Sequence, residues 1–372
     1  MAKNDYLLGV LMLPGSSTCH QAESTSSRKG IGQISRSAVT FYRRVHLMRI
    51  EEVFGRCGIG IYLCLLVSET KAATPPSFAA AVGYTNSTFS STFDSSSVDL
   101  RNTVKAGYKW YISRFCGYGV TPASAITANN DSTITLENTG AANSGILTAG
   151  HINGNWVGTV FGGGGYFEAI LKFDPQTVTN STKGWPAWWS IPIEHELTFG
   201  SWQWPGQAEG YAHYVEPDFF EWNIDGSEGV PPKTYNVTMN DWSGIWTPEK
   251  GYPVCKQNSW KKKFNTTPST TDFKQYHKYG WLWIPASPTR KGYAKYYFDD
   301  LPSTNSFSWT QFTNQSPTPS ESMDPWTFGI LDQQHLVLVL GSGASGAMTV
   351  KAVNVWQRND DANGHNGGLP LK

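Results

Sequence analysis

Short runs of aromatic and β-branched residues, each closed by Gly, Pro, Ser, Thr or Asn, recur along the chain from about residue 74 onward. Runs of this kind favour β-strands, whereas long helical patterns rich in Lys, Glu, Ala and Leu are nearly absent. About ten or more such runs imply a sandwich or a barrel. We therefore predict an all-β protein, with strand segments that include "GGGGYFEAILKF" (162–173), "WPAWWSIPI" (185–193), "TYNVTMNDW" (234–242), "HKYGWLWIPA" (277–286) and "AMTVKAVNVWQ" (347–357).

The composition narrows the class of protein further. The 372 residues include 16 tryptophans and 37 glycines, and 39% are hydrophobic, which is ample for a core. The formal net charge is zero, so we expect no nucleic-acid partner. No shift in composition marks a second folded domain, and we predict one β-sandwich domain over residues 74–357. The polar, Gly- and Asn-rich segment 358–372 is predicted to be disordered.

The first part of the chain differs from the rest. An apolar run at 57–67 is followed by the small residues Ala72 and Ala73. This order is typical of a secretory signal peptide over residues 48–73, and the apolar run is shorter than the roughly 20 residues that span a bilayer. We expect the mature protein to be secreted or extracytoplasmic and free of the membrane. Residues 1–47 are then either an unusual leader or translation from an upstream start, and we favour the upstream start. A buried core helix is the alternative for the apolar run.

Removal of this leader, residues 1–73, would leave two of the five cysteines, Cys116 and Cys255. An even pair of cysteines in an oxidising compartment indicates a disulfide, and we predict that these two are joined. Two separate buried thiols are the alternative.

One predicted strand carries an unusual set of acids. The segment "GYAHYVEPDFFEWNIDG" (210–226) holds Glu216, Asp218 and Glu221 among aromatic residues, where an unpaired buried carboxylate is costly. Side chains alternate along a strand, so Glu216 and Asp218 share a face, and one β-bulge brings Glu221 to the same face. Retaining hydrolysis of a glycosidic bond needs two carboxyl groups about 5–5.5 Å apart. A solvent-facing acidic edge strand and a calcium site are the alternatives.

The order of several segments resembles glycoside hydrolase family 16, the laminarinase-like members of the concanavalin A-like lectin/glucanase superfamily. "GGGGYFEAILKF" is similar to the family's G-Y-F-E-A-R strand, "GWPAWW" to its W-P-A-F-W strand, "EPDFFE" to its bulged E-x-D-x-x-E motif, and "AMTVKAVNVWQ" to its closing strand. These segments fall in order across most of residues 80–357. Three departures indicate a divergent member: Ile170 replaces an arginine, Pro217 replaces a branched aliphatic residue, and Asn240 ends a strand that commonly ends Thr-x-His.

The resemblance implies a β-jelly-roll sandwich of two curved antiparallel sheets with a concave substrate cleft. It implies Glu216 as nucleophile, Asp218 as its helper and Glu221 as acid/base of a secreted retaining endo-glycosidase. The expected partner is a β-linked polysaccharide, first a β-1,3- or mixed-linkage glucan, bound by a monomer that requires no cofactor, and a structural calcium ion is left open. Two other functions stay open, a non-catalytic carbohydrate-binding lectin and a transglycosylase that remodels a wall polymer.

Aromatic residues near the acids are candidates for stacking on sugar rings. Trp189 matches the second tryptophan of the family's W-P-A-F-W strand and is expected to face the cleft, whereas Trp185 and Trp188 are expected in the core. Trp222 follows Glu221 directly and is also expected to point into the core. Other substrate-binding candidates are Asn240 and, on predicted loops where a position at the cleft and one away from it both stay open, Trp202, Trp204, Trp242 and Trp246.

The leader gives a first test. Secreted protein should begin near Ala72 or Ala73, because the apolar run and the small residues of a cleavage site meet there. N-terminal sequencing of the exported material checks this. A mature protein that still carries residues 1–47 would contradict both the signal peptide and the upstream start.

Overall fold

The computed structural model describes residues 73–113, 119–137, 144–152, 155–177, 185–194, 211–222, 233–245, 256–259, 263–311, 327–342, 347–358 and 367–371. All of these residues belong to one compact unit, Ser68–Lys372. Several predictions fall outside the described residues: the leader up to residue 72, the disulfide partners Cys116 and Cys255, and the tryptophans Trp202, Trp204 and Trp246.

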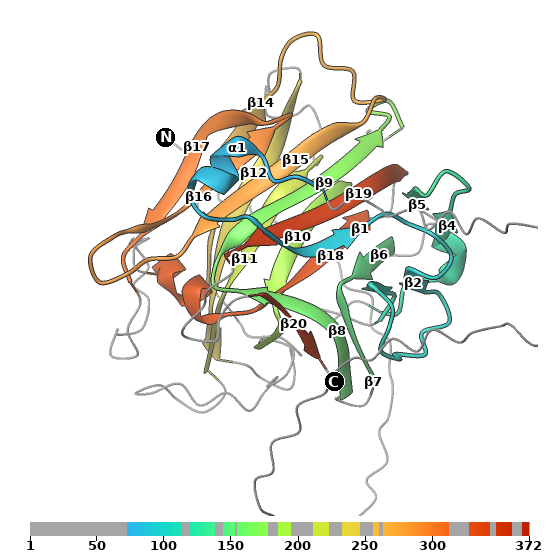
Figure 1. Cartoon of the computed structure of the whole chain (residues 1–372), viewed down its shortest axis with the longest axis horizontal. Helices are drawn as coiled ribbons and strands as arrows, with labels where there is room; N and C mark the ends of the chain where they lie inside the picture. The colour runs from blue at the N-terminus through green and yellow to red at the C-terminus, as the bar shows by residue number, and fades with distance from the viewer. Residues whose placement is uncertain are drawn as a thin grey trace, which may run out of the picture. The chain divides into compact units, whose positions relative to one another are not determined.

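Eight of the described strands form one antiparallel sheet, which we name the first sheet (Figure 1). Its central strand β9 pairs with β15 on one side and with β19 on the other. In spatial order the strands are β17 (Leu301–Trp309), β16 (Gly292–Phe298), β15 (His277–Ile284), β9 (Gly165–Phe173), β19 (Met348–Gln357), β5 (Ile134–Leu136) and β4 (Ile126–Ala128), and β1 (Asn86–Ser91) also pairs with β19.

The other twelve described strands form the second sheet. All of its pairings are antiparallel except that between the two-residue strands β2 and β3. In spatial order they are β13 (Lys256–Ser259), β12 (Thr234–Ile245), β11 (Tyr211–Glu221), β10 (Pro186–Pro192), β18 (Leu336–Ser342), β6 (Ser144–Leu147), β3 (Trp110–Tyr111) and β2 (Val98–Asp99). Off this order, β14 (Lys263–Thr266) pairs with β12, and β8 (Asn155–Gly162) pairs with β18, β7 (Ala149–Ile152) and β20 (Gly367–Leu371).

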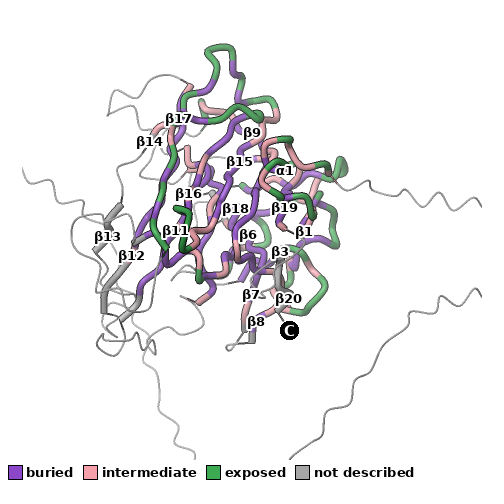
Figure 2. Tube along the Cα trace, turned by 60° about the vertical axis from the view of Figure 1, so that its left-hand side comes forward, coloured by how far each residue is buried: buried purple, intermediate pink, exposed green. Residues whose placement is uncertain are grey.

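The two sheets enclose one large apolar core, and buried residues run along the strands of both (Figure 2). Strand β12 shows how the sequence produces this arrangement: Tyr235, Val237 and Met239 belong to the core, and the polar residues between them point to the other face. The expected all-β jelly-roll sandwich is confirmed. In the described part of the chain, helical structure comprises α1 (Ser77–Ala81), the 3-10 turns η1 (Ala123–Ala125) and η3 (Thr327–Gln333), and the helical residues Ile193 and Glu194 directly after β10.

The described residues contain no helix of the length and apolar character that a bilayer crossing would require.

Residues 73–84, which we name the N-terminal strap, cover the outer face of the first sheet. Phe78 stacks on Tyr297 with ring centroids 3.9 Å apart and planes 2° apart. The carbonyl of Ala73 accepts the indole N–H of Trp356 at 3.0 Å, and the hydroxyl of Tyr84 donates to a backbone carbonyl of β15 at 2.6 Å. The strap buries a second apolar cluster that lies outside the main core.

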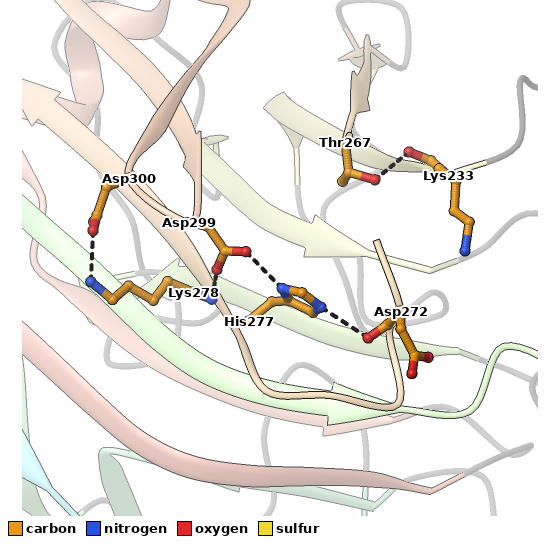
Figure 3. Close-up of polar contacts among 7 residues, drawn as sticks. All are labelled: Lys233, Thr267, Asp272, His277, Lys278, Asp299 and Asp300. Atoms are coloured by element: carbon orange, nitrogen blue, oxygen red, sulfur yellow. Dashed lines mark hydrogen bonds and ion pairs between the residues drawn. The ribbon is translucent and has the colours of Figure 1, made fainter. Parts of the chain in front are cut away.

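The turn between β16 and β17 is held by polar contacts (Figure 3). Its residues Asp299 and Asp300 have φ of 48° and 65°, a combination that two-residue hairpins usually reserve for Asn and Gly. Asp299 accepts the backbone N–H of Lys278 at 2.8 Å and contacts His277 Nδ1 at 2.7 Å. Asp300 pairs with Lys278 Nζ at 2.7 Å. The carboxylates thus take part in the anchoring of a strained backbone, which a glycine could not do.

The predicted disorder of residues 358–372 is wrong for part of that segment. Gly367–Leu371 forms β20, which pairs with β8 from Gly367 opposite Gly162 to Leu371 opposite Gly158. A sheet ladder is made by backbone groups, so a glycine-rich segment with few apolar side chains can still join it. Pro370 lacks an N–H and suits a strand whose ladder bonds lie on one side.

Glu168 is a buried acid on the strap side of the first sheet. It lies on β9 opposite Asn354 of β19, is 3% exposed, and its Oε1 accepts Asn354 Nδ2 at 3.4 Å. Burial raises the pKa of Glu168 from 4.5 to about 7, and the positive charge of Lys278 opposes this shift. Because the folded state holds this proton longer than the unfolded chain, Glu168 lowers stability as pH rises from about 4.5 through 7.

The substitution Glu168→Gln should therefore raise the free energy of unfolding at pH 8 by about 3 kcal/mol and leave it little changed at pH 4.5, since the amide has no proton to lose. Urea unfolding of both proteins from pH 4.5 to 8 measures the difference. Glu137→Gln, at an exposed position, is the control and should follow the wild type at every pH. A difference between wild type and Glu168→Gln that does not change with pH would contradict the assignment.

Candidate active site

Strands β11 and β12 of the second sheet bring the predicted acids together. Glu216 lies opposite Asn240, Asp218 opposite Thr238, and Glu221 opposite Asn236. Between Asp218 and Glu221, β11 advances three residues while β12 advances two, and this mismatch is a β-bulge. The predicted bulge is therefore present, and the three acids lie on the face of the second sheet that points away from the core, which we name the acid face.

The bulge is held by two consecutive phenylalanines. Phe219 and Phe220 are at most 1% exposed and both belong to the core. Phe219 stacks on Trp281 with centroids 4.6 Å apart, and Phe220 packs on Tyr279 at 4.3 Å, so both reach the first sheet. Two adjacent core-facing side chains reset the alternation of β11, and the last acid of the motif returns to the face of the first two.

Asn240 joins two of the acids. Its Nδ2 donates to Glu216 Oε1 at 3.0 Å and to Asp218 Oδ2 at 2.8 Å. An amide nitrogen carries two hydrogens, so each carboxyl group can receive one of them. Asn240 was predicted to bind substrate. In the structure its side-chain amide contacts the acids and fixes the relative position of their oxygens, and its contact with substrate stays a prediction.

The third acid is held by a tryptophan that the sequence assigned to the core. The indole N–H of Trp185 donates to Glu221 Oε1 at 2.8 Å, and both residues are partly exposed. The core assignment of Trp185 is wrong, because Trp185 is an even number of residues from Ala187 and Trp189, which lie opposite Glu221 and Asp218, so alternation directs its side chain to the acid face. Trp188, inside β10, is fully buried in the core as predicted.

The acids do not ionise independently. Burial, followed by the negative charge of Glu221, raises the pKa of Glu216 to about 7. Burial, followed by the charges of Glu221 and Glu216, raises the pKa of Asp218 well above its usual range. The hydrogen bonds from Asn240 oppose both shifts because they favour the ionised carboxylates. Burial and the neighbouring charges thus raise the pKa of Glu216 and of Asp218 together, so near neutral pH the three acids carry less negative charge than three exposed carboxyl groups would.

Aromatic rings accompany the acids on the acid face. Trp189 pairs with Asp218 across β10 and β11 and is partly exposed. On β12, Trp242 lies opposite Tyr214, and their rings stack with centroids 6.2 Å apart and planes 18° apart. The indole N–H of Trp242 makes no well-aligned hydrogen bond within the described residues, but its dipole favours the ionised form of Glu216 and lowers its pKa.

Other predicted residues are placed as follows. Trp222 packs against the core, as expected, with its ring 4.9 Å from that of Phe173. Trp202 and Trp204 lie outside the described residues, so their roles stay predictions. No group of three or more His, Cys, Asp and Glu side chains suited to a metal ion occurs among the described residues, and structural calcium also stays a prediction.

This arrangement places two carboxyl groups of the same face in different surroundings. Glu216 is poised to ionise near neutral pH, and Glu221 is held by a neutral N–H donor farther along the same strand. The raised pKa of Asp218 between them limits the negative charge on the acid face. One ionised and one protonatable carboxyl on the same face can attack a bond and protonate its leaving group.

Comparison with known proteins gives likeness of fold at low identity. No protein-family model matches the sequence, and no curated protein matches it. The endo-1,3-β-glucanase of Streptomyces sioyaensis is 19% identical, with a TM-score of 0.41, and the match covers 78% of this chain and 100% of that one. A β-agarase A in complex with oligoagarose is 12% identical, with a TM-score of 0.42 and coverage of 73% and 91%. The mannose-bound exoplasmic/lumenal domain of VIP36 is 9% identical, with a TM-score of 0.35 and coverage of 76% and 97%.

Identities and TM-scores this low assign neither a family nor an activity to this chain.

Substitution of the two adjacent tryptophans of β10 tests whether their side chains lie on opposite faces of the second sheet. Trp188→Ala should lower the free energy of unfolding by about 3–5 kcal/mol, because it empties a fully buried site. Trp189→Ala should cost clearly less, because Trp189 is partly exposed on the acid face. Urea unfolding of the two variants, each the control for the other, gives the comparison. Equal losses would contradict the alternation on which the site is built.

Proposed function

We propose that this protein is a secreted, monomeric, retaining endo-glycosidase of glycoside hydrolase family 16 that hydrolyses a β-linked polysaccharide. The observation that carries the proposal is the bulge in β11, which places Glu216, Asp218 and Glu221 on one face while Asn240 and Trp185 hold their carboxyl groups. The sequence resemblance of the same strand and its neighbours to this family supports the proposal.

Glu216 acts as the nucleophile. Its carboxylate attacks the anomeric carbon, the glycosidic bond breaks, and a covalent glycosyl-enzyme forms. The raised pKa of Asp218 favours its neutral form beside Glu216, which lowers the negative charge next to the carboxylate that attacks. Asn240 orients both groups throughout, since its Nδ2 contacts both.

Glu221 acts as the acid and then as the base. Protonated, it gives its proton to the departing sugar oxygen. As a carboxylate, it then removes a proton from the water that hydrolyses the intermediate. The indole of Trp185 donates to one oxygen of Glu221 and restrains the orientation of the carboxyl group during both steps.

The substrate is a chain of pyranose rings, first a β-1,3- or mixed-linkage glucan. Trp189 and Trp242 are partly exposed and supply flat apolar surfaces on the acid face, and such surfaces suit the apolar faces of sugar rings. Trp189 lies on β10 and Trp242 on β12, the two strands on either side of β11, so a polymer that crosses β11 can contact both.

Substitution of the acids should separate their roles. Glu221→Gln should lower kcat on polysaccharide by about 10²–10⁴-fold but keep activity on an aryl glycoside with a good leaving group, where protonation matters less. Glu216→Ala should lose both activities, and Asp218→Asn should be impaired on both. Assays of purified protein against a panel of β-glucans, with proton NMR of the first-formed product, measure these effects and the expected retention of configuration.

Glu168→Gln is the matched control, because it neutralises a buried acid on the other sheet and should leave activity unchanged. An inverted product or full activity in Glu216→Ala would show the assignment to be wrong. Binding of glycans without cleavage would indicate a lectin. Products that appear only with an acceptor sugar would indicate a transglycosylase.

A further inference from the structure

A polar pair lies in the core directly behind the acid face. His213 Nε2 and Asp241 Oδ1 are 2.7 Å apart, and both side chains are 1% exposed. Their strands otherwise send apolar side chains into the core at this level, such as Val215 and Met239. The pair is separate from the acids, because it points to the opposite face of the same sheet.

The pair joins the two strands that carry the site. His213 belongs to β11, three residues before Glu216, and Asp241 belongs to β12, next to Asn240. In the ladder Asp241 lies opposite Val215, so the contact with His213 runs diagonally across the two strands. A diagonal contact resists sliding of β11 along β12, and sliding is the motion that would separate Asn240 from the acids.

Gln334 holds the backbone of β11 near His213, in the part of the strand that no longer pairs with β10. The pairing of β10 with β11 extends from Ala187 opposite Glu221 only to Trp189 opposite Asp218. Beyond that point, the buried Gln334 side chain takes the place of a strand, since its Oε1 accepts Val215 N at 3.3 Å and its Nε2 donates to the carbonyl of His213 at 3.2 Å.

Stability alone does not account for a polar pair at this place. The free-energy cost of desolvating a buried polar pair offsets most of the energy of its interaction. Apolar residues of similar size can therefore often replace such a pair without lowering the stability of the fold. Asp241 Oδ2 is also buried with no hydrogen-bond partner among the described residues, which adds to the cost. What the pair supplies and apolar residues do not is a directional contact that defines one register.

We propose that His213 and Asp241 are positioning residues, which lock β11 against β12 and thereby keep the amide of Asn240 on Glu216 and Asp218. The proposal rests on the proposed glycosidase function for its effect on the reaction. Loss of the pair lets Asn240 shift relative to the acids, so attack by Glu216 becomes less well aligned, while the aromatic surfaces that bind the polymer stay in place. The defect falls on kcat and not on KM.

The decisive variant replaces the pair with apolar residues, His213→Leu with Asp241→Leu. It should unfold at a denaturant midpoint equal to or above that of the wild type, yet lose about 10- to 100-fold in kcat with KM unchanged. Asp241→Asn keeps an oxygen that accepts from His213 and should retain most of the activity. The control Glu168→Leu with Asn354→Leu removes a buried acid and its cross-strand partner from the other sheet, and its kcat should equal that of the wild type.

A second readout does not depend on catalysis. In ¹³C NMR titrations of Glu216, the wild type should show a raised pKa, and the double Leu variant a higher one still, because a displaced Asn240 no longer favours the carboxylate. The groups that face Glu216 from the same strand and from β12, namely Asp218, Glu221, Trp242 and Asn240, are the same in both proteins.

The outcomes separate the two proposals. If the wild type cleaves no glycan, the proposed function fails, and the titration still decides the positioning role. A double Leu variant with the kcat and the Glu216 titration of the wild type would overturn the positioning role. If that variant does not fold, Asp241→Val, which removes the contact with His213, decides through the same titration, and a Glu216 pKa that stays at the wild-type value in Asp241→Val would overturn it. Asp241→Asn keeps the contact and should titrate as the wild type does.

Discussion

The one-residue bulge in β11 is the constraint on which the site depends. Without it, Glu221 would follow the strict alternation of the strand and enter the core, where a carboxylate has no partner. With it, Phe219 and Phe220 both fill the core against the first sheet, and the apolar contacts of these two rings hold the irregular backbone in place. The geometry of the acids on one face is therefore maintained by hydrophobic packing on the other.

Polar contacts on both faces of β11 and β12 also fix the position of these two strands relative to each other. On the acid face, Asn240 bridges Glu216 and Asp218, and on the core face the His213–Asp241 pair ties the same two strands together. Asn240 and Asp241 are neighbours on β12, and they contribute to opposite faces because successive side chains of a strand point to opposite faces. A short stretch of two strands can thus fix a reactive group from both sides.

Much of the architecture follows from local sequence signals. Strand segments such as 162–173, 234–242 and 277–286 are predictable because aromatic and β-branched residues alternate there with turn residues around them, and the spacing of Glu216, Asp218 and Glu221 indicates the bulge. The contacts of Asn240 and His213 are not predictable in this way, because they require the register between β11 and β12, and a connection separates these strands along the chain.

Two expectations are wrong for different reasons. Trp185 is four residues before Trp189, so alternation places both on the acid face, and the assignment of Trp185 to the core together with Trp188 does not follow that pattern. Residues 367–371 pair through backbone groups, which composition does not report. Likewise, alternation along β9 assigns Glu168 to the outer face, but its burial depends on a distant part of the chain that covers that face.

The N-terminal strap has a consequence for the order of folding. Its Ala73 contacts Trp356, 283 residues away, and the first strand β1 pairs with β19. The central strands β9 and β10 also have β19 and β18 as neighbours, and both of these come late in the chain. Neither sheet can close while the C-terminal part is still being synthesised. Because contacting residues are far apart in the sequence, we expect folding to be slow and to reach completion only after the whole chain has been synthesised. Until then, the aromatic strands of the core are exposed to solvent and are prone to aggregation.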